Sequence, residues 1–364
     1  MVSRIVPARS FKAENAAFEK WLGRQCAVVR KDLKKKYEKM RKDPFTFLRA
    51  TYFRWARRIE AINPSLAKAP AVLCVGDVHL ENFGTWRDAE GRWVWGINDF
   101  DEAAIMPYPF DLVRLVTSAH LAPGLALSID DIAASVLKGY RRGLEQPRAT
   151  LLDEHETWMR PHVACSDAER LAFWQEIDAL PTADPPRLVK RGLQRSLPPG
   201  ARIMRFATRA KGNGGLGQPR FIAVAVWCGG RVVREARALV PSAWTWAHSK
   251  SSLGETKAKL HFAELADGAH RSPDPWLALR QGFVFRRIAA DSRKVELDKE
   301  DQARLTRRLL EAMGFDIGAI HAAAKKSRLR AIADHLAAQP KSWLPAAALD
   351  AAADVVRDYE EWAR

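Results

Sequence analysis

Apolar residues recur at helical spacing over the first 62 residues of the chain. Residues 11–42 carry one apolar stripe and residues 45–62 carry a second, a pattern that predicts two amphipathic helices. An Asp-Pro pair at 43–44 ends the first helix and an Asn-Pro pair at 63–64 ends the second, because a residue before proline disfavours the helical conformation.

The pattern changes to strands between residues 71 and 102. The apolar run 71–75 predicts a buried strand, and a polar loop, 77–82, follows it. Two β-rich segments, 83–87 and 92–98, are joined by the turn sequence Asp-Ala-Glu-Gly, which predicts a hairpin. The second segment leads directly into an acidic cluster at 98–102. A strand, an acidic loop and a hairpin therefore place two sets of carboxylates near each other.

Helices and a second group of strands make up the rest of the chain, which predicts an α+β protein. The expected helices are 111–121, 130–144, 166–180, 253–265 and 299–364. The expected strands are 201–207, 221–227, 231–239 and 282–288, with a glycine-rich segment at 211–217 between the first two. This predicts a small antiparallel β unit with a glycine loop.

Composition favours a cytoplasmic globular protein. Hydrophobic residues make up 47% and charged residues 28% of the chain, which is ordinary for such proteins. We find no apolar run of the roughly 18 residues that a membrane span needs, and the N-terminal segment lacks an apolar secretion core. The four cysteines have no metal-like spacing and are expected to be free thiols: Cys26, Cys74, Cys165 and Cys228.

The formal net charge of +16 widens the choice of partners. A basic surface attracts nucleic acid, anionic lipid or phosphorylated compounds, whereas an excess spread over solvated helices binds nothing in particular. The densest basic run, residues 30–42, lies on an expected helix and predicts a solvated face. A nucleic-acid-binding protein remains an alternative on this ground.

The acidic loops carry the residue types that phosphoryl transfer needs. Asp77 and Asn82 have the spacing of the base and the metal-binding Asn in a kinase catalytic loop. The hairpin then delivers Asp99 and Asp101, and hard cations such as Mg²⁺ bind oxygen ligands of this kind. We therefore predict Asp77 as a catalytic base and Asn82, Asp99 and Asp101 as metal ligands.

The segments GDVHLENFG, INDFDEA and FDLVRL resemble the core of aminoglycoside phosphotransferases and choline kinases. They resemble more closely an uncharacterised bacterial family, domain of unknown function 2252, which is grouped with the protein-kinase-like superfamily. DPFTFLRA, VREARALVPSAW, FRRIAADSRKVEL and DYEEW extend this second resemblance along the chain. The resemblance implies a two-lobe, protein-kinase-like fold and no particular substrate.

The order of the segments departs from that of kinases. In kinases the glycine-rich lobe precedes the catalytic loop, whereas here it follows, and MGFDIGAIHA near the C-terminus resembles the helix that precedes the loop in aminoglycoside kinases. A circularly permuted kinase fold would give this order; an unrelated fold for the flanking segments is the alternative. The permuted interpretation divides the chain into N-terminal helices (1–70), a catalytic segment (71–200), a nucleotide-binding β segment (201–290) and completing helices (291–364).

The kinase interpretation assigns ATP to the glycine-rich loop and to a neighbouring cation. Its backbone N–H groups would hold phosphates, although a plain hairpin turn explains the glycines nearly as well. Arg234 stands where a kinase has its third-strand lysine, with Glu255 or Glu264 as the helix partner, and arginine does not replace lysine neutrally. The predicted cofactor-binding residues are Lys211, Gly212, Gly214, Gly215, Gly217 and Arg234.

Four further residues near the motifs have two interpretations each. His79 either shapes the site, which makes it a catalytic candidate, or is a hydrogen-bonded loop residue. Glu81 is expected to be a surface or loop-capping carboxylate, and Asp111 an N-cap or a brace for the catalytic loop. His321 lies on an apolar helix face and is expected to be a hydrogen-bonded core histidine.

These features together predict a Mg²⁺-dependent, ATP-using phosphotransferase acting on a hydroxyl of an unknown small molecule or protein. A kinase-like module that binds nucleotide without turnover is the first alternative, because of Arg234, and an adenylyl transferase uses the same parts. Asp77-Val78-His79 also resembles the opening of binuclear metallophosphoesterases, but the further motifs of that class are missing from the sequence.

Overall fold

The computed structural model describes residues 9–210, 212, 214–249, 259–295 and 302–364. Four helices open the described chain: α1 (Phe11–Gln25), α2 (Arg30–Met40), α3 (Pro44–Ala50) and α4 (Tyr52–Ile62). The two helices predicted here are thus each divided. The first breaks where Cys26 is extended, and the second where the hydroxyl of Thr51 donates to the carbonyl of Phe47 at 2.8 Å.

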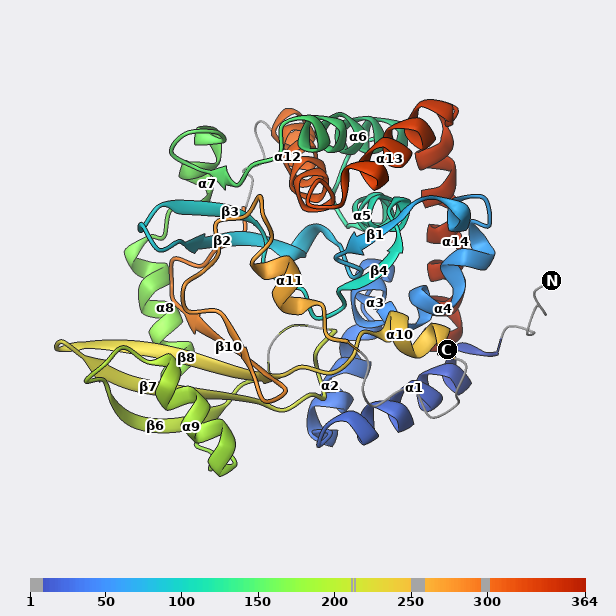
Figure 1. Cartoon of the computed structure of the whole chain (residues 1–364). Coiled ribbons are helices and arrows are strands. Elements are labelled where there is room, and N and C mark those ends of the chain that lie inside the picture. Colours follow the sequence, from blue (N-terminus) through green and yellow to red (C-terminus); the bar gives the residue numbers. More distant parts are fainter. Residues whose placement is uncertain (1–8, 211, 213, 250–258, 296–301) are drawn as a thin grey trace.

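These helices pack against the C-terminal helix α14 (Trp343–Ala363), which lies beside α4 in Figure 1. Arg54 donates to Asp358 at 2.6 Å and Arg58 to Asp354 at 2.7 Å, so two buried or half-buried ion pairs join α4 to α14. The two ends of the chain therefore share one hydrophobic core.

The predicted strand and hairpin of residues 71–98 are confirmed. β1 (Ala71–Cys74) pairs antiparallel with β4 (Ala104–Pro107), and β2 (Phe83–Arg87) pairs with β3 (Trp93–Ile97). A short strand, β5 (Thr150–Leu151), extends the hairpin. The loop between β1 and β2 carries Asp77, His79 and Asn82. It includes a 3₁₀ turn at Leu80–Asn82.

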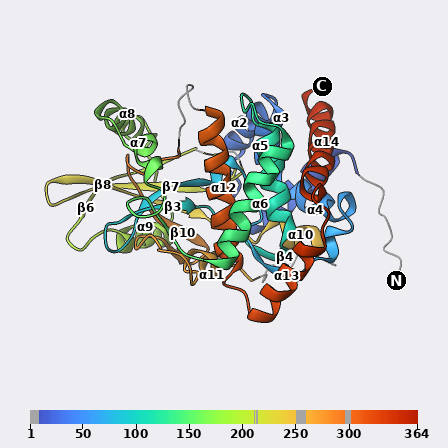
Figure 2. The same ribbon diagram turned by 90° about the horizontal axis from the view of Figure 1, so that it is seen from above.

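Three helices stand side by side in Figure 2: α5 (Pro109–Leu121), α6 (Ile129–Glu145) and α12 (Gln302–His321). Glycines line the contact between α6 and α12, which come from distant parts of the sequence. A Cβ placed on any of them would overlap a backbone carbonyl oxygen of the facing helix: Gly139, Gly143, Gly314 and Gly318. The two backbones approach closely because no side chain separates them.

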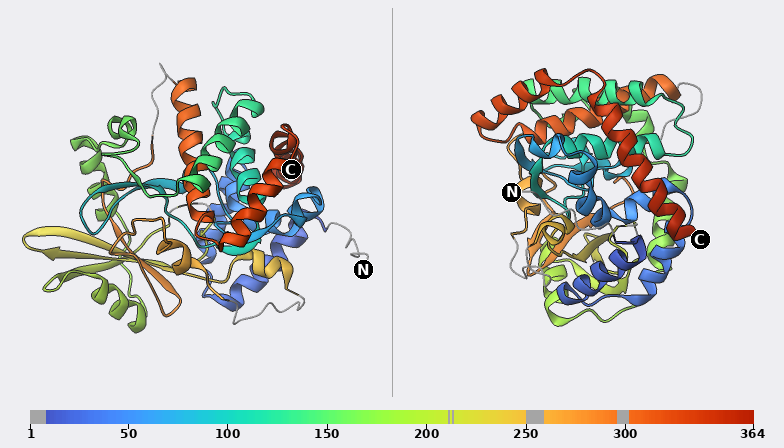
Figure 3. Two further views of the ribbon diagram at one scale, coloured as in Figure 1. Left: turned by 45° about the horizontal axis from the view of Figure 1, so that its top comes forward. Right: turned by 90° about the vertical axis from the view of Figure 1, so that its right-hand side faces the viewer.

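The predicted β unit is a five-stranded antiparallel sheet in the order β6-β7-β8-β10-β9. Figure 3 shows it on the opposite side of the molecule from α14. Helices α8 (Asp167–Asp178) and α9 (Arg187–Ser196) cover its two faces with separate apolar clusters. The strands are β6 (Arg202–Thr208), β7 (Arg220–Trp227), β8 (Gly230–Ala238), β9 (Ala278–Arg280) and β10 (Phe283–Ile288).

Short elements complete the described chain. They are the 3₁₀ turns Leu66–Lys68 and Thr157–Met159 and the helices α7 (Arg160–Val163), α10 (Ala243–His248), α11 (Phe262–Ala266) and α13 (Lys326–Ala338). Part of the helix predicted at 253–265 lies outside the described residues, and α11 is the part that the structure describes. None of the described helices has the length and apolar character that crossing a bilayer demands.

The glycine contact between α6 and α12 gives a test of the fold. Gly314→Ala places a methyl group against the carbonyl of Val136, so we expect the free energy of unfolding to fall by about 3 kcal/mol. Urea denaturation measures this. Gly23→Ala is the matched control, because Gly23 lies in α1 with open space around its Cα, and it should gain up to about 1 kcal/mol from helix propensity. Equal effects of the two substitutions would contradict the close packing.

Candidate functional site

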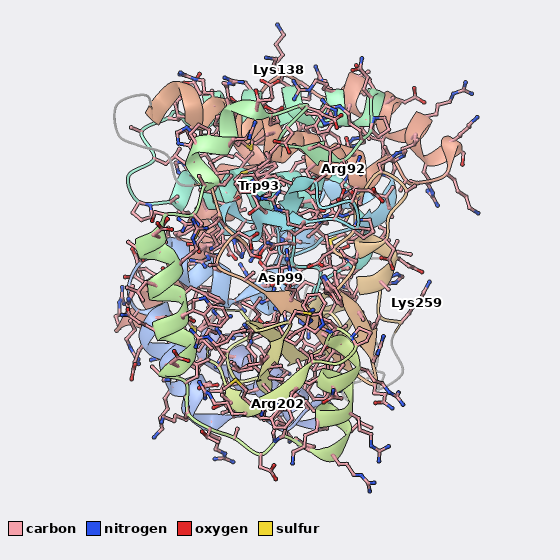
Figure 4. The ribbon with its side chains drawn as sticks, turned by 90° about the vertical axis from the view of Figure 1, so that its left-hand side faces the viewer. Arg92, Trp93, Asp99, Lys138, Arg202 and Lys259 are labelled. Atoms are coloured by element: carbon pink, nitrogen blue, oxygen red, sulfur yellow. The ribbon has the colours of Figure 1, made fainter. Side chains whose placement is uncertain are left out.

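A cavity of about 1040 Å³ lies between the loops after β1 and β3 on one side and the five-stranded sheet on the other. Figure 4 shows Asp99 in the middle of the molecule, between the hairpin that carries Arg92 and Trp93 and the sheet whose first strand begins at Arg202. The predicted residues Asp77, His79, Asn82, Asp99 and Asp101 all line this cavity. The structure therefore brings together the acidic residues that the sequence singled out.

Asp77 is placed by the sharp turn at the end of β1. Gly76 has φ +86°, and a Cβ at this position would overlap the carbonyl oxygen of Glu102 and crowd the hydroxyl of Tyr52. Only glycine fits both the backbone conformation and the space. The chain can therefore turn directly from the buried strand into the cavity.

Arg114 on α5 holds one oxygen of Asp77. Its Nε donates to Asp77 Oδ1 at 2.9 Å, its Nη2 donates to the same oxygen and to the carbonyl of Leu48 at 3.0 Å, and its guanidinium stacks on two aromatic rings, Tyr52 and Trp55. Burial raises the pKa of Asp77, and Arg114 opposes that shift. Asp77 Oδ2 lies on the side of Gly214, 3.6 Å from a Cβ built on that glycine.

Asp111 braces the same loop from below. Its two carboxylate oxygens accept from the backbone N–H groups of Val75 and Gly76 at 2.8 and 2.9 Å, and it is fully buried. The bracing role predicted for Asp111 is confirmed. His321 is the buried, hydrogen-bonded core histidine that we expected: its ring contacts Asp111 at 3.3 Å and the hydroxyl of Tyr140 at 3.0 Å.

The register of the hairpin brings Asn82 to the acidic cluster. Phe83 pairs with Ile97, and the ladder continues one step further, where the backbone N–H of Asn98 donates to the carbonyl of Asn82 at 3.1 Å. The side-chain amide of Asn82 donates to the carbonyl of Asp77 at 2.5 Å, which ties the two ends of the catalytic loop together. Asn82 and Asp99 are therefore neighbours because of strand pairing.

Arg237 on β8 contacts both aspartates. Its guanidinium donates to the two oxygens of Asp99 at 3.1 and 3.0 Å and also to Asp101. Burial opposes ionisation of Asp99, but the charge of Arg237 and its hydrogen bonds outweigh burial and lower the pKa of Asp99. Burial raises the pKa of Asp101 to about 7, against the pull of Arg237. One cation therefore neutralises a pair of carboxylates.

The structure does not bring Arg234 to this site, so our choice of the phosphate-binding cation needs correction. Arg234 donates to the carbonyl of Ser196 at 2.7 Å and lies over the ring of Trp276, on the α9 side of the sheet. Side chains alternate along a strand, so positions 234 and 237 face opposite ways. The sequence predicts this alternation along the strand. It does not predict which face of the strand meets the acidic loops.

The glycine-rich loop forms one wall of the cavity. Three of the predicted glycines line the cavity, Gly212, Gly214 and Gly215. Gly217 faces Leu33 of α2 instead, and it shares a positive φ with Gly212. Helix α2 positions this loop, since Lys39 Nζ donates to the carbonyl of Gly212 at 3.0 Å and the N–H of Val29 donates to that of Gly217 at 2.8 Å. Lys211 lies outside the described residues.

A group of arginines on the sheet faces the same cavity. Glu235 is fully buried on the α8 side of β8, beside Arg286 at 2.7 Å, Arg220 at 3.5 Å and Arg209 at 3.6 Å. Burial alone would raise the pKa of Glu235, but the charges of these arginines outweigh that effect and lower the pKa. Of the helix glutamates proposed to pair with the cation, Glu264 pairs instead with His261 and Lys259, and Glu255 lies outside the described residues.

His79 and Glu81 complete the loop. His79 is buried and its Nδ1 accepts from the N–H of Glu81 at 3.2 Å. Burial and the nearby cations, Arg49 first among them, lower the pKa of His79 well below its ordinary value, so its ring is neutral at pH 7. Glu81 forms a two-bond ion pair with Arg49 at 2.6 and 2.7 Å, and thereby links the loop to α3.

One cluster of metal-ligating residue types lies outside the cavity. Within the described ranges, Cys74, Asp111 and His321 bring a thiol, a carboxylate and an imidazole close together in the core. Each has a partner already: the thiol contacts the carbonyl of Met106 at 3.5 Å, and the other two make the bonds given above. Burial raises the pKa of the Cys74 thiol well above its ordinary value, so this cluster fits a structural role.

Comparison with protein families gives one match. Residues 28–170 match the model of an uncharacterised protein family conserved in bacteria, DUF2252, which confirms the resemblance to that family. The matched region holds the loop of Asp77 and Asn82, the hairpin, Asp111 and α2, and it ends before the five-stranded sheet. Neither curated proteins nor solved structures yielded a match to the chain.

The brace under the catalytic loop can be tested by charge removal. Asp111→Asn replaces a carboxylate that accepts two backbone bonds with an amide that cannot accept both, so we expect the free energy of unfolding to fall by about 3 kcal/mol. Asp130→Asn is the matched control, because Asp130 also lies in the first turn of a helix but is exposed. It should change stability by less than about 1 kcal/mol. Urea denaturation of both variants is the measurement, and similar losses would contradict the brace.

Proposed function

We propose that this protein is a Mg²⁺-dependent, ATP-using phosphotransferase that acts on a hydroxyl group. The observation that carries the proposal is the convergence of three separate segments on one cavity. The loop of Asp77, the acidic pair after the hairpin and the glycine-rich loop all line it, together with Arg237 from the third strand of the sheet. Phosphoryl transfer needs these parts: a base, metal ligands, a phosphate-binding loop and a cation.

Asp77 is suited to take a proton from a hydroxyl. Arg114 holds Oδ1, and Oδ2 is turned toward the glycine-rich loop. Burial raises the pKa of this carboxyl while Arg114 keeps the charged form accessible, and a base works best when its pKa approaches the working pH. Arg114 is a positioning residue in this scheme, because it acts through Asp77.

The oxygen ligands of the cavity fit a magnesium ion. The carboxylates of Asp99 and Asp101 and the side-chain carbonyl of Asn82 are hard donors of the kind that Mg²⁺ prefers, and the hairpin register holds Asn82 beside the other two. These three residues would hold the ion, which would supply positive charge to stabilise the phosphate oxygens during transfer. Asp99, with a side chain 34% exposed, is the most accessible of the acidic pair.

The sheet side of the cavity suits a polyanion. Arg220, Arg237 and Arg286 line it on the α8 side of the sheet, and arginine pairs bidentately with phosphate. Together with the glycine-rich loop between the first two strands, this side corresponds to the nucleotide-binding lobe of a kinase. Because it follows the catalytic loop in the chain, we infer a circularly permuted, kinase-like fold, in which α12 returns from the C-terminal part to pack on α6.

A second candidate is a nucleotide-binding module without turnover. The contact of Arg237 with both Asp99 and Asp101 favours it, because an arginine that holds both aspartates competes with a metal ion for them. An adenylyl transferase would use the same cavity with the nucleotide bound in the reverse orientation. Transfer of AMP instead of the γ-phosphoryl group would identify that reaction. The binuclear phosphoesterase alternative needs a second metal-binding histidine, whereas His79 is a neutral acceptor within its own loop.

Nucleotide binding is tested by two arginine substitutions three residues apart. We expect wild-type protein to bind Mg-ATP in calorimetric titration and Arg237→Met to bind it about thirtyfold more weakly, the loss of one charged hydrogen-bonding group. Arg234→Met should bind like the wild type, because Arg234 faces α9. No binding of Mg-ATP by the wild type, or equal losses in both variants, would contradict the proposed site.

Catalysis is tested at Asp77. Asp77→Asn keeps the shape and a hydrogen bond to Arg114 but cannot accept the hydroxyl proton, so we expect transfer of the γ-phosphoryl group to fall about a thousandfold while Mg-ATP binding stays within about twofold. Release of radiolabelled phosphate to water or to a panel of hydroxyl compounds measures transfer. Binding without transfer by the wild type would favour the non-catalytic candidate, and transfer of AMP would favour the adenylyl transferase.

A further inference from the structure

Lys36 lies on the buried face of α2, where an amphipathic helix normally has an apolar residue. The buried face of α2 consists of Leu33, Lys36 and Met40, while Lys31, Lys34 and Lys35 of the same basic run are exposed. The solvated face that we predicted for residues 30–42 is therefore correct for those three lysines and wrong for Lys36. A residue that breaks the local pattern is expected where function requires it.

The side chain of Lys36 is largely buried and lines the cavity without an ion-pair partner among the described residues. The residue is 5% exposed, and among the described residues it has no hydrogen-bond or ion-pair partner; its Nζ lies 5.9 Å from the centre of the Phe53 ring. Burial lowers its pKa, and the charges of Glu19, Glu102 and Asp77 act in the opposite direction. Burying an unpaired ammonium is costly, so the fold alone gives no reason to keep a lysine here.

Lys36 lines the same cavity as Asp77, on the side away from the sheet. A second polar atom there lacks a partner: the buried hydroxyl of Tyr52 makes no hydrogen bond within the described part of the chain. The rings of Phe18 and Phe53, stacked at 4.5 Å, and Leu22 form the apolar wall. This end of the cavity, which we call the Lys36 subsite, therefore offers two donors beside an apolar surface.

We propose that the Lys36 subsite binds the anionic group, a carboxylate or a phosphate, of the hydroxyl compound that accepts the phosphoryl group. The identification of the ligand as the phosphoryl acceptor rests on the proposed function. The binding of an anion at this site rests on Lys36 and Tyr52 alone. Lys36 and the Tyr52 hydroxyl would donate to the anion, and the apolar wall would contact the carbon atoms that join it to the hydroxyl at Asp77.

The carboxylate of Glu102 does not exclude an anion. Its Oε2 accepts from the Ala243 N–H at 2.6 Å and from the Ser242 hydroxyl at 3.0 Å, at the start of α10. Both bonds direct this oxygen of Glu102 toward α10. The nucleotide-facing arginines lie on the sheet, across the cavity, so the acceptor and the nucleotide would have separate cations.

Lys36→Met tests the subsite, with Lys35→Met as the exposed neighbour for control. Without added anion, Lys36→Met should unfold at the same or a higher urea concentration than wild type, because it removes an unpaired buried charge. Inorganic phosphate or acetate should raise the urea midpoint of wild type and Lys35→Met, by ligand linkage. In Lys36→Met the apparent affinity for that anion should be at least about tenfold lower. If phosphate raises the urea midpoint, the acceptor is a phosphorylated compound; if acetate raises it, the acceptor is a carboxylic acid.

Three results would overturn the proposal. The first is an early unfolding of Lys36→Met, which would make Lys36 a structural residue. The second is an equal response of both variants to phosphate and to acetate. The third is a loss of Mg-ATP affinity in Lys36→Met by calorimetry, which would assign Lys36 to the nucleotide. If wild type binds no Mg-ATP, the proposed function fails while the anion measurement still decides whether the subsite exists.

Discussion

The buried carboxylate of Asp111 is the interaction on which the candidate site depends. It accepts the N–H groups of Val75 and Gly76, at the point where β1 ends and the chain turns into the cavity. A buried loop must have its backbone groups satisfied, and Asp111 does so where no strand partner is available. Because α5 also carries Arg114, one helix fixes both the backbone before Asp77 and the orientation of its side chain.

The rest of the site is assembled from segments that are far apart in the chain. The hairpin holds Asn82 against Asp99 through strand pairing, and β8 supplies Arg237 from more than 130 residues away. Helix α2 reaches the glycine-rich loop through Lys39 and Val29. Cations contact most of the acidic groups of the loops: Arg114 contacts Asp77, Arg49 contacts Glu81 and Arg237 contacts the aspartate pair. Glu102 instead accepts from Ser242 and Ala243.

Two sides of one cavity thus differ in chemistry. The sheet side presents arginines whose charges are shared with Glu235 and the aspartates, which suits a ligand that carries several negative charges and a metal ion. On the α2 side, the Lys36 ammonium and the Tyr52 hydroxyl have no partner among the described residues and lie next to aromatic rings, which suits a smaller ligand with an anionic group. Asp77 lines the same cavity, and in the proposed function it would act as the base between the two ligands.

The sequence by itself determined the local part of this arrangement. Turn chemistry and alternating apolar residues set the hairpin, and the register of the hairpin places Asn82 opposite Asn98, next to Asp99. Glycines between two strand patterns set the glycine-rich loop. Tertiary structure alone decided that Arg237 and not Arg234 meets the aspartates, because alternation defines two faces of a strand without saying which one the rest of the chain covers. It likewise decided that Lys36 is buried while Lys31, Lys34 and Lys35 are exposed, since the packing of α2 against α3 and α14 depends on contacts that no helical pattern encodes.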